Sequence, residues 1–285
     1  MNRGHVLVVG ATGTVGYELL LQLRSHEFPC SAMLRRSNAE LPEGVRPVYA
    51  DLTCPSSLRT ALQGVDLVFL LSGDSPDQVK QECAVIDAAK MCGVRGIVKS
   101  SAFAAGLDPP LAYGANHAHV EQYLKNSGLE WAILRPTMFM QNFLELSAAI
   151  SQRGLLPLPF GNAKVSLIDA RDVALAASTL FRQNGPWQRT YEINGPEAIN
   201  MEAAAHELSK TTGRSVRYLS PPFWVIALIM QAQGIRRWDI RMRKQLFTMI
   251  RSGGESNCSS DFQELTGQMP GSFAEFTQRY FRTCR

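Results

Sequence analysis

The sequence predicts an α/β fold in which helices cover both faces of a doubly wound parallel sheet, followed by a smaller, mostly helical C-terminal lobe. The first observation is an apolar run without alternation, Val6 to Val9, which is typical of a strand buried on both faces. The second is a set of three glycines between this run and an apolar helix-like stretch. The third is the alternation of strand-like and helix-like segments through the first half of the chain. Together they predict a Rossmann-type domain.

The periodicity of apolar residues, with the glycines and prolines at segment ends, places the elements. After the first strand, further strands are expected at 30–38, 45–52, 66–73, 96–103 and 129–136, and helices at 55–64, 75–94 and 115–128. Beyond Pro136 the rhythm loosens, and we expect a helix at 138–154, a strand end leading into a helix at 165–181 with Asp172 at its start, and a strand–helix pair at 190–213.

The change of rhythm suggests two parts. We expect an NAD(P)-binding Rossmann domain at 1–155 and a smaller substrate-binding lobe at 156–285, partly interwoven with the first domain. Ligands of such sheets bind beyond the carboxyl ends of the strands.

The three glycines form the pattern G-x-x-G-x-x-G between a strand and a helix. Gly10 suits the tight turn, Gly13 lets the backbone approach a pyrophosphate, and Gly16 lets the helix pack close to the strand. The helix N-terminus would then offer N–H groups to the phosphates. A tight turn without a ligand is the alternative. The other residues expected to hold the cofactor in this turn are Thr12, Thr14 and Val15.

The end of the second strand indicates which dinucleotide is bound. It carries Arg35 and Arg36, and the first acid is Glu40. A guanidinium group suits the 2′-phosphate of NADP, whereas an acid would hold the ribose of NAD. We therefore expect NADPH, with NADH as the second choice; arginines that simply lie in solvent at the strand end are the alternative.

Composition narrows the class of protein. The 285 residues are 45% hydrophobic and carry a formal net charge of +4, which does not favour a nucleic-acid partner. The six cysteines are scattered, which fits a reduced, cytoplasmic protein. No metal site is expected, because no histidine has partners at ligand spacing. Phe223 to Met230, the longest later apolar run, is too short for stable membrane insertion.

Four stretches carry a resemblance to a known family: GATGTVG at 10–16, YADL at 49–52, HVEQYLKNSGLEWAILRPTMFMQNF at 119–143 and DARDVALAA at 169–177. The chain resembles the atypical short-chain dehydrogenase/reductases of the NmrA-like group. The resemblance implies an NAD(P)H-dependent reductase of quinones, dyes, imines or phenylpropanoid double bonds. A minority of the group bind NADP as redox-sensing regulators without turnover, and this alternative stays open here.

The resemblance also implies positions along the cofactor. Asp51 would contact the adenine amino group, although it can equally cap the helix that follows. Ser101 would place a hydroxyl near the reacting carbon. The remaining positions implied to line the cofactor are Leu52, Leu71, Ser72, Gly73, Ser100, Pro136 and Thr137.

The catalytic motif departs from the pattern of the best-known short-chain dehydrogenases, Y-x-x-x-K. Here Tyr113 is followed four residues later by His117, and Glu121 extends the same helix face. We expect His117 to hold the ribose or relay the proton, with Tyr113 as candidate donor. The alternatives are a Tyr113 that packs on the second lobe and a His117 on the helix surface. His119 is expected on another face.

Apolar residues after the nicotinamide-side strand and in the second lobe suggest a pocket for a flat, apolar acceptor. The expected substrate residues are Phe103, Met138, Phe139, Met140, Phe143, Phe160 and Trp224. A basic, amphipathic segment at 234–251 is expected to be a surface helix; an anionic gate or a membrane-surface contact is the alternative reading.

These inferences predict an NADPH-dependent reductase of a small hydrophobic or aromatic acceptor, acting as a monomer or homodimer. A non-catalytic NADP-binding redox sensor is the alternative, kept open by the missing lysine. A nucleotide-sugar epimerase is disfavoured for the same reason.

Overall fold

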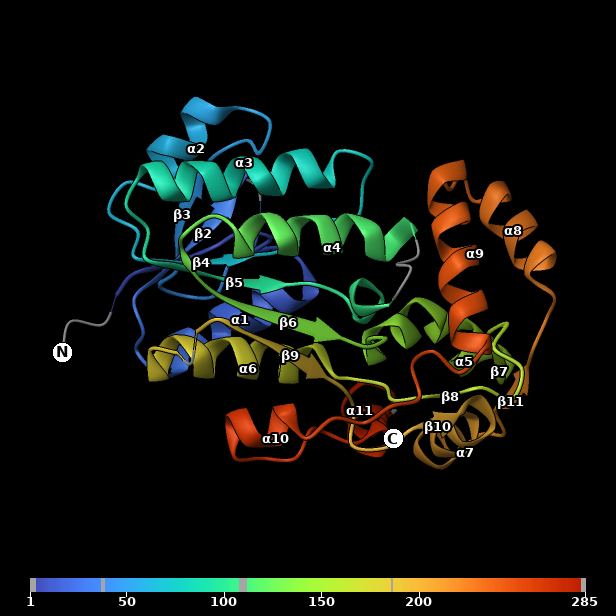
Figure 1. Ribbon diagram of the computed structural model, residues 1–285. Coiled ribbons are helices and arrows are strands. Elements are labelled where there is room, and N and C mark those ends of the chain that lie inside the picture. The colour runs from blue at the N-terminus through green and yellow to red at the C-terminus, as the bar shows by residue number, and fades with distance from the viewer. Residues whose placement is uncertain (1–3, 37–38, 108–111, 186, 283–285) are drawn as a thin grey trace.

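The computed structural model describes residues 4–36, 39–107, 112–185 and 187–282, with the backbone alone for Ala112 and Tyr113. A seven-stranded sheet in the order β3-β2-β1-β4-β5-β6-β9 forms its centre (Figure 1). All neighbouring strands of this sheet run parallel. The strands are β1 (Val6–Val8), β2 (Cys30–Leu34), β3 (Arg46–Tyr49), β4 (Leu67–Leu70), β5 (Gly96–Ser100), β6 (Glu130–Pro136) and β9 (Arg189–Ile193). The strand order reverses between β1 and β4, and such a switch point is where ligands bind in open α/β sheets.

Helices cover both faces of the sheet, as predicted. One face is covered by α1 (Thr14–Ser25) and α6 (Ala170–Gln183), which pack on each other. The other face is covered by α2 (Pro55–Ala61), α3 (Gln78–Met91) and α4 (Ala112–Lys125) (Figure 1). A separate apolar core fills each interface. Strands β1, β2, β4 and β5 are buried throughout, which explains why their sequences do not alternate.

Most of the remaining elements form a lobe beyond the carboxyl ends of β5 and β6 (Figure 1). Its strands are paired as β7 (Leu155–Pro157) with β11 (Arg217–Leu219) and β8 (Lys164–Val165) with β10 (Ile199–Asn200). Its helical segments are η1 (Phe103–Gly106), η2 (Met140–Leu146), α5 (Ser147–Arg153), α7 (Met201–Thr212), α8 (Phe223–Ala232), α9 (Arg237–Arg251) and α11 (Phe273–Tyr280). Helix α10 (Asp261–Thr266) instead packs on α6 and β9, at the edge of the central sheet (Figure 1). The division at residue 155 stays a prediction; β9 and α6 come from beyond this point but belong to the central sheet and its cover.

Two expected helices begin elsewhere than predicted. The segment at 138–154 first pairs with Ile168, whose N–H donates to the Met138 carbonyl at 3.0 Å while its own carbonyl accepts from Met140 at 2.8 Å. Only then do η2 and α5 follow. The helix expected to start at Asp172 is capped instead by Asp169, whose carboxylate accepts from the Arg171 N–H at 3.0 Å. Among the described residues, no helix is long and apolar enough to cross a membrane.

Candidate functional site

Two adjoining cavities lie at the carboxyl edge of the sheet, at the switch point between β1 and β4. The larger, of about 620 Å³, runs along the ends of β2 and β3, and the smaller, of about 410 Å³, runs toward β5 and α4. Both are lined by Gly10, Thr12, Leu71, Ser72 and Gly73. The two cavities share these five residues and together form one elongated site. We call the cavity at the ends of β2 and β3 the adenosine-side cavity and the cavity toward β5 and α4 the nicotinamide-side cavity, after the cofactor orientation predicted from the sequence.

The glycine turn is built as predicted. Gly10 has a φ of +79°, and the Gly13 N–H donates to the Gly10 carbonyl at 3.0 Å. A Cβ at Gly16 would lie 2.2 Å from the same carbonyl oxygen, so only glycine lets α1 approach β1 this closely. Thr14 and Val15 form the first turn of α1, with Thr14 exposed and Val15 buried. The first N–H groups of the helix therefore open on the edge where the cavities lie.

The adenosine-side cavity contains Arg35, Asp51 and Leu52. Arg36 is also exposed but does not line it. The Asp51 carboxylate accepts from the Thr53 N–H at 2.8 Å and from the Thr53 hydroxyl at 2.7 Å, and these hydrogen bonds lower the pKa of Asp51. The alternative role of Asp51 as a helix cap is wrong, because α2 begins at Pro55 and its N-cap is Cys54.

The nicotinamide-side cavity is lined by Ser100, Ser101, His117 and Phe139. The Ser100 hydroxyl is buried and has no hydrogen-bond partner among the described residues. A buried hydroxyl without a partner is costly, so its position at a cavity wall fits a ligand that brings a polar group to it. This observation, with the glycine turn, shows that the residues present fit a nicotinamide dinucleotide.

Ser101 belongs to a buried network that joins three elements. Its hydroxyl donates to Glu121 of α4 at 2.6 Å, and Arg135 of β6 binds both Glu121 oxygens, at 2.9 and 2.6 Å. Burial acts to raise the pKa of Glu121, but the hydrogen bonds from Arg135 and Ser101 outweigh it and hold the pKa below its usual value. The network thus fixes α4 against the ends of β5 and β6.

His117 is also buried, contrary to the surface alternative, with 2% of its area exposed. Its Nε2 lies 3.3 Å from the Gln78 amide nitrogen and 3.8 Å from Asp74, which lines the cavity. Its Nδ1 lies 3.5 Å from the ammonium group of Lys99. Lys99 is itself fully buried and paired with Glu82 at 3.0 Å. His117 therefore stands between the cavity and a buried ion pair.

The helix carrying the predicted motif starts at Ala112, so Tyr113, His117 and Glu121 occupy successive turns of α4. The side chain of Tyr113 lies outside the described part of the chain, and its role as proton donor stays a prediction. His119 is exposed, as predicted for another face of the helix.

A match to a family of known proteins covers almost the whole chain. Residues 2–277 match the NmrA-like family. This chain belongs to the NmrA-like family. Its curated relatives include the NAD(P)H azoreductase of Xenophilus azovorans, which is 32% identical over 96% of this chain and 97% of the relative. Quinone oxidoreductase 2 of Escherichia coli (strain K12) is 27% identical over 97% of this chain and 98% of its own length.

Solved structures agree with this membership. The NADPH complex of an NADPH-dependent quinone oxidoreductase from Escherichia coli superposes with a TM-score of 0.85, at 26% identity, and covers 97% of this chain and 99% of the other. The Citrobacter sp. triphenylmethane reductase complexed with NADP(H) has a TM-score of 0.83 at 23% identity, over 96% and 99% of the two chains, and shows the shared fold.

Within this NmrA-like site, the predicted substrate residues lie in three environments. Phe139 lines the nicotinamide-side cavity, and Phe103 and Met138 are buried in adjoining segments. Met138 also belongs to the apolar core of the lobe, as do Met140, Phe143 and Phe160. Trp224 is 65% exposed on α8. Pro136 and Thr137 are buried at the end of β6, where the Thr137 hydroxyl donates to the Ser166 carbonyl. Their roles toward a substrate or cofactor stay predictions.

Sequence reasoning missed Lys99, Glu82 and Glu255. Lys99 had a visible signal, because it is a charged residue in an otherwise buried strand, and such a residue requires a partner. Glu255 comes from the segment after α9, and its carboxylate accepts the Met138 N–H at 3.0 Å. Burial raises the pKa of Glu255 to about 7, although this hydrogen bond limits the rise. No spacing in the sequence connects the two residues.

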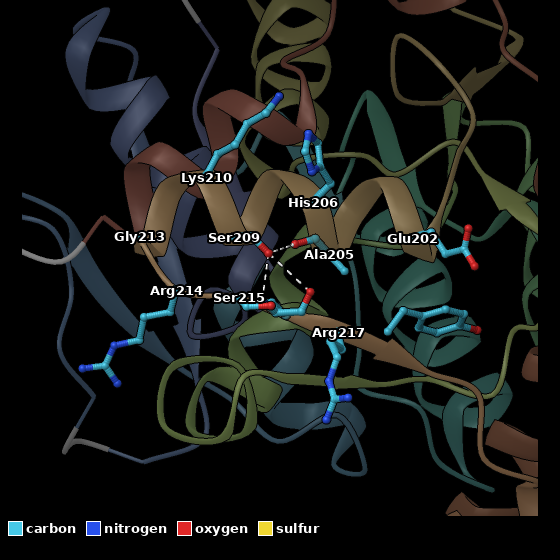
Figure 2. A pocket seen from close by; sticks show the side chains of 11 residues that line it. Glu202, Ala205, His206, Ser209, Lys210, Gly213, Arg214, Ser215 and Arg217 are labelled. Atoms are coloured by element: carbon cyan, nitrogen blue, oxygen red, sulfur yellow. Dashed lines mark hydrogen bonds between the residues drawn. The ribbon is translucent and has the colours of Figure 1, made fainter.

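A wider groove of about 950 Å³ lies on the lobe, between α7 and β11 (Figure 2). The Ser209 hydroxyl at its centre donates a hydrogen bond to the Ala205 carbonyl at 2.7 Å and accepts one from the Val216 N–H at 2.8 Å. These bonds hold α7 to the chain leading into β11. The groove contains no strand-end residue of the central sheet, so the two cavities at the sheet edge remain the candidate site.

Proposed function

We propose that this NmrA-like protein is an NADPH-dependent reductase of a small hydrophobic acceptor such as a quinone, imine or enone, with NADH as the second choice. The observation that carries the proposal is the meeting of the Ser100 hydroxyl, His117 and Phe139 at one cavity, directly beyond the glycine turn. Both curated relatives named above carry the names of reducing or redox enzymes. The redox-sensor alternative is not favoured, because these relatives are enzymes.

The cofactor is held by residues of both cavities. The glycine turn and the first turn of α1 bind the pyrophosphate, and Arg35 binds the 2′-phosphate. Leu52 and Asp51 flank the adenine. When bound, the nicotinamide supplies a hydride. Ser100 gives its hydroxyl to the nicotinamide half, while Ser101, held by Glu121, shapes the same wall.

The acceptor is proposed to lie against Phe139, which gives a flat apolar surface beside the polar groups of the cavity. Negative charge that develops on the acceptor as it is reduced needs a hydrogen-bond donor at that place. His117 is the described side chain suited to this role, since its imidazole borders the cavity. Tyr113, one turn earlier on α4, is the second candidate donor.

The test measures the oxidation of NADPH in the presence of a panel of quinones, imines, enones, azo compounds and triarylmethane dyes. The reaction is monitored by the decrease in the absorbance of the reduced nicotinamide. The variant is His117→Ala and the control is His119→Ala, since both histidines belong to α4 but His119 is exposed. We expect His117→Ala to lower kcat by ~100-fold and His119→Ala to act like the parent protein. Equal rates for both variants would disprove the role of His117. Tight NADPH binding without turnover of any acceptor would contradict the reductase.

Four further expectations complete the proposal. We place the protein in the cytoplasm as a monomer or homodimer, with a small aromatic substrate and without a nucleic-acid partner. The scattered cysteines and the weak net charge support this assignment.

A further inference from the structure

The ammonium group of Lys99 is surrounded by three acceptors. It is 3.0 Å from the nearer Glu82 oxygen, it donates to the Ser100 carbonyl, and it is 3.5 Å from Nδ1 of His117. The Lys99 and Glu82 side chains are both fully buried. The second Glu82 oxygen is 3.2 Å away from the ammonium nitrogen. Since a lysine ammonium has three N–H groups and no acceptor, it can direct one N–H to each of these three residues.

The other end of this cluster is fixed as well. One Glu82 oxygen accepts both the N–H and the hydroxyl of Ser72, at 3.0 and 2.8 Å. Ser72 belongs to the loop after β4 that lines both cavities. Helix α3, the β4 loop, β5 and α4 are therefore joined in one buried chain of contacts that runs from Ser72 through Glu82 and Lys99 to His117.

The Lys99 ammonium facing Nδ1 determines which nitrogen of the His117 ring carries the proton. Because Lys99 can only donate, Nδ1 must accept, and a neutral ring then carries its proton on Nε2. Nε2 is the nitrogen on the side of Asp74, which lines the nicotinamide-side cavity. Gln78, which also faces Nε2, then turns its amide oxygen to the ring, since the two ends of an amide are assigned from the hydrogen-bond network.

We propose that Lys99 is a positioning residue for the reductase: it holds His117 in the Nε2–H form and so keeps a hydrogen-bond donor, bound to Gln78 in the resting protein, at the border of the nicotinamide-side cavity. The fixed cation that the motif at Tyr113–His117 lacks is thus supplied from β5 instead of α4. The proposal rests on the proposed function for its catalytic meaning, but the tautomer itself is a property of the resting protein.

The test is ¹⁵N NMR of the full chain labelled at histidine, at alkaline pH, with the His117 signals assigned by their loss in His117→Asn. Among the described contacts of the ring are those with Lys99, Asp74 and Gln78, with Glu82 behind Lys99. The test variant is Lys99→Met combined with Glu82→Gln, which removes the donor without leaving a buried carboxylate unpaired. Lys99→Arg is the conservative variant, because arginine also only donates. Thermal unfolding checks that each variant is folded.

We expect the parent protein and Lys99→Arg to show a proton on Nε2 alone, and the double variant to populate both tautomers. In the reductase assay, the double variant should lose about tenfold or more in kcat, with its Kd for NADPH within about threefold of the parent value. A proton on Nδ1 in the parent protein, or an unchanged tautomer in the folded double variant, would overturn the proposal. The NMR result needs no acceptor, so it stands or fails independently of whether the protein proves to be a reductase.

Discussion

The two halves of the site are built by different means. The adenosine half is shaped by backbone: Gly10 and Gly16 set how closely strand and helix approach, and the neighbouring strand ends supply the walls. The nicotinamide half is shaped by buried charges from four elements, with Glu121 bound to Arg135 and Glu82 bound to Lys99. The first half therefore depends on the absence of side chains, and the second on charged side chains that are costly to bury alone.

The largest effect on stability is expected from removing the charge of Glu121, which belongs to the charged network of the nicotinamide half. Glu121→Gln leaves the Arg135 guanidinium without its carboxylate, so the free energy of unfolding in urea should fall by ~3 kcal/mol. The control is Lys125→Met, because Lys125 is 3.7 Å from the same carboxylate but more exposed, and it should cost less than ~1 kcal/mol. Equal losses for both variants would contradict the assignment.

The Glu121 carboxylate also makes the free energy of unfolding depend on pH. The pKa of Glu121 is lower in the folded protein than in the unfolded chain, where it is about 4.3. Its stabilisation is therefore present above the unfolded pKa and is lost as pH falls through the folded pKa. Urea titrations from neutral to acidic pH should show this loss in the parent protein and lack it in Glu121→Gln.

Substitution of one glycine in each half tests the two halves of the site separately. A Cβ at Gly16 would meet the Gly10 carbonyl oxygen at 2.2 Å, and a Cβ at Gly114 would meet the Ala104 carbonyl oxygen at the same distance. Gly16→Ala should weaken NADPH binding by ~100-fold, or ~2.7 kcal/mol, because α1 must move from the pyrophosphate. Gly114→Ala displaces α4 and should mainly lower kcat. Fluorescence titration with NADPH distinguishes the two variants. A greater loss of NADPH affinity in Gly114→Ala than in Gly16→Ala would contradict the assignment of the two glycines to different halves of the site.

The two arginines after β2 allow a finer comparison within the adenosine half. Arg35 lines the cavity and Arg36 does not. Arg35→Ser should raise the Kd for NADPH about tenfold, or ~1.4 kcal/mol, and leave the Kd for NADH unchanged. Arg36→Ser should change neither value by more than about twofold. If Arg36→Ser selectively weakened NADPH binding instead, Arg36 would be the phosphate ligand.

The smallest effect on stability is expected from a substitution of Glu255, whose carboxylate accepts the Met138 N–H. Its pKa of about 7 is raised above the unfolded value of about 4.3, so the unfolded chain loses its proton first as pH rises. The folded protein is thus destabilised progressively across this range. Glu255→Gln keeps an acceptor for the Met138 N–H and should add ~1 kcal/mol of stability at pH above 7, with less gain at low pH. A variant that is less stable at alkaline pH would contradict this sign.

The contrast also explains what could be predicted from the sequence. The parallel strands and the glycine turn are local patterns, since burial on both faces and close backbone approach each leave a mark within a few residues. A lysine in a buried strand indicates that it needs a partner, but no local pattern indicates that His117 is one of its neighbours. Lys99 of β5 and His117 of α4 lie 18 positions apart in sequence and meet only through the tertiary fold.

The aromatic and methionine residues after β6 illustrate the same difference. Their apolar character predicts burial, but it does not indicate which core they enter. Phe143 packs on Phe273 with ring centroids 4.7 Å apart, and Phe160 packs on Phe247 at 5.3 Å, so both rings have partners from distant helices of the lobe. Phe139 alone of this group lines the described cavity. Its neighbours differ from it in tertiary contacts, not in residue type.

The bond between Met138 and Glu255 sets an order of events during synthesis. The amide of Met138 leaves the ribosome 117 residues before the carboxylate that receives it. The central strands up to β6 can pair while the chain is still growing, since N-terminal segments fold first. The turn that places Phe139 at the cavity receives this hydrogen bond only when the segment after α9 has been synthesised. A nascent chain stalled before Glu255 should therefore bind the adenosine half of the cofactor before it can position an acceptor.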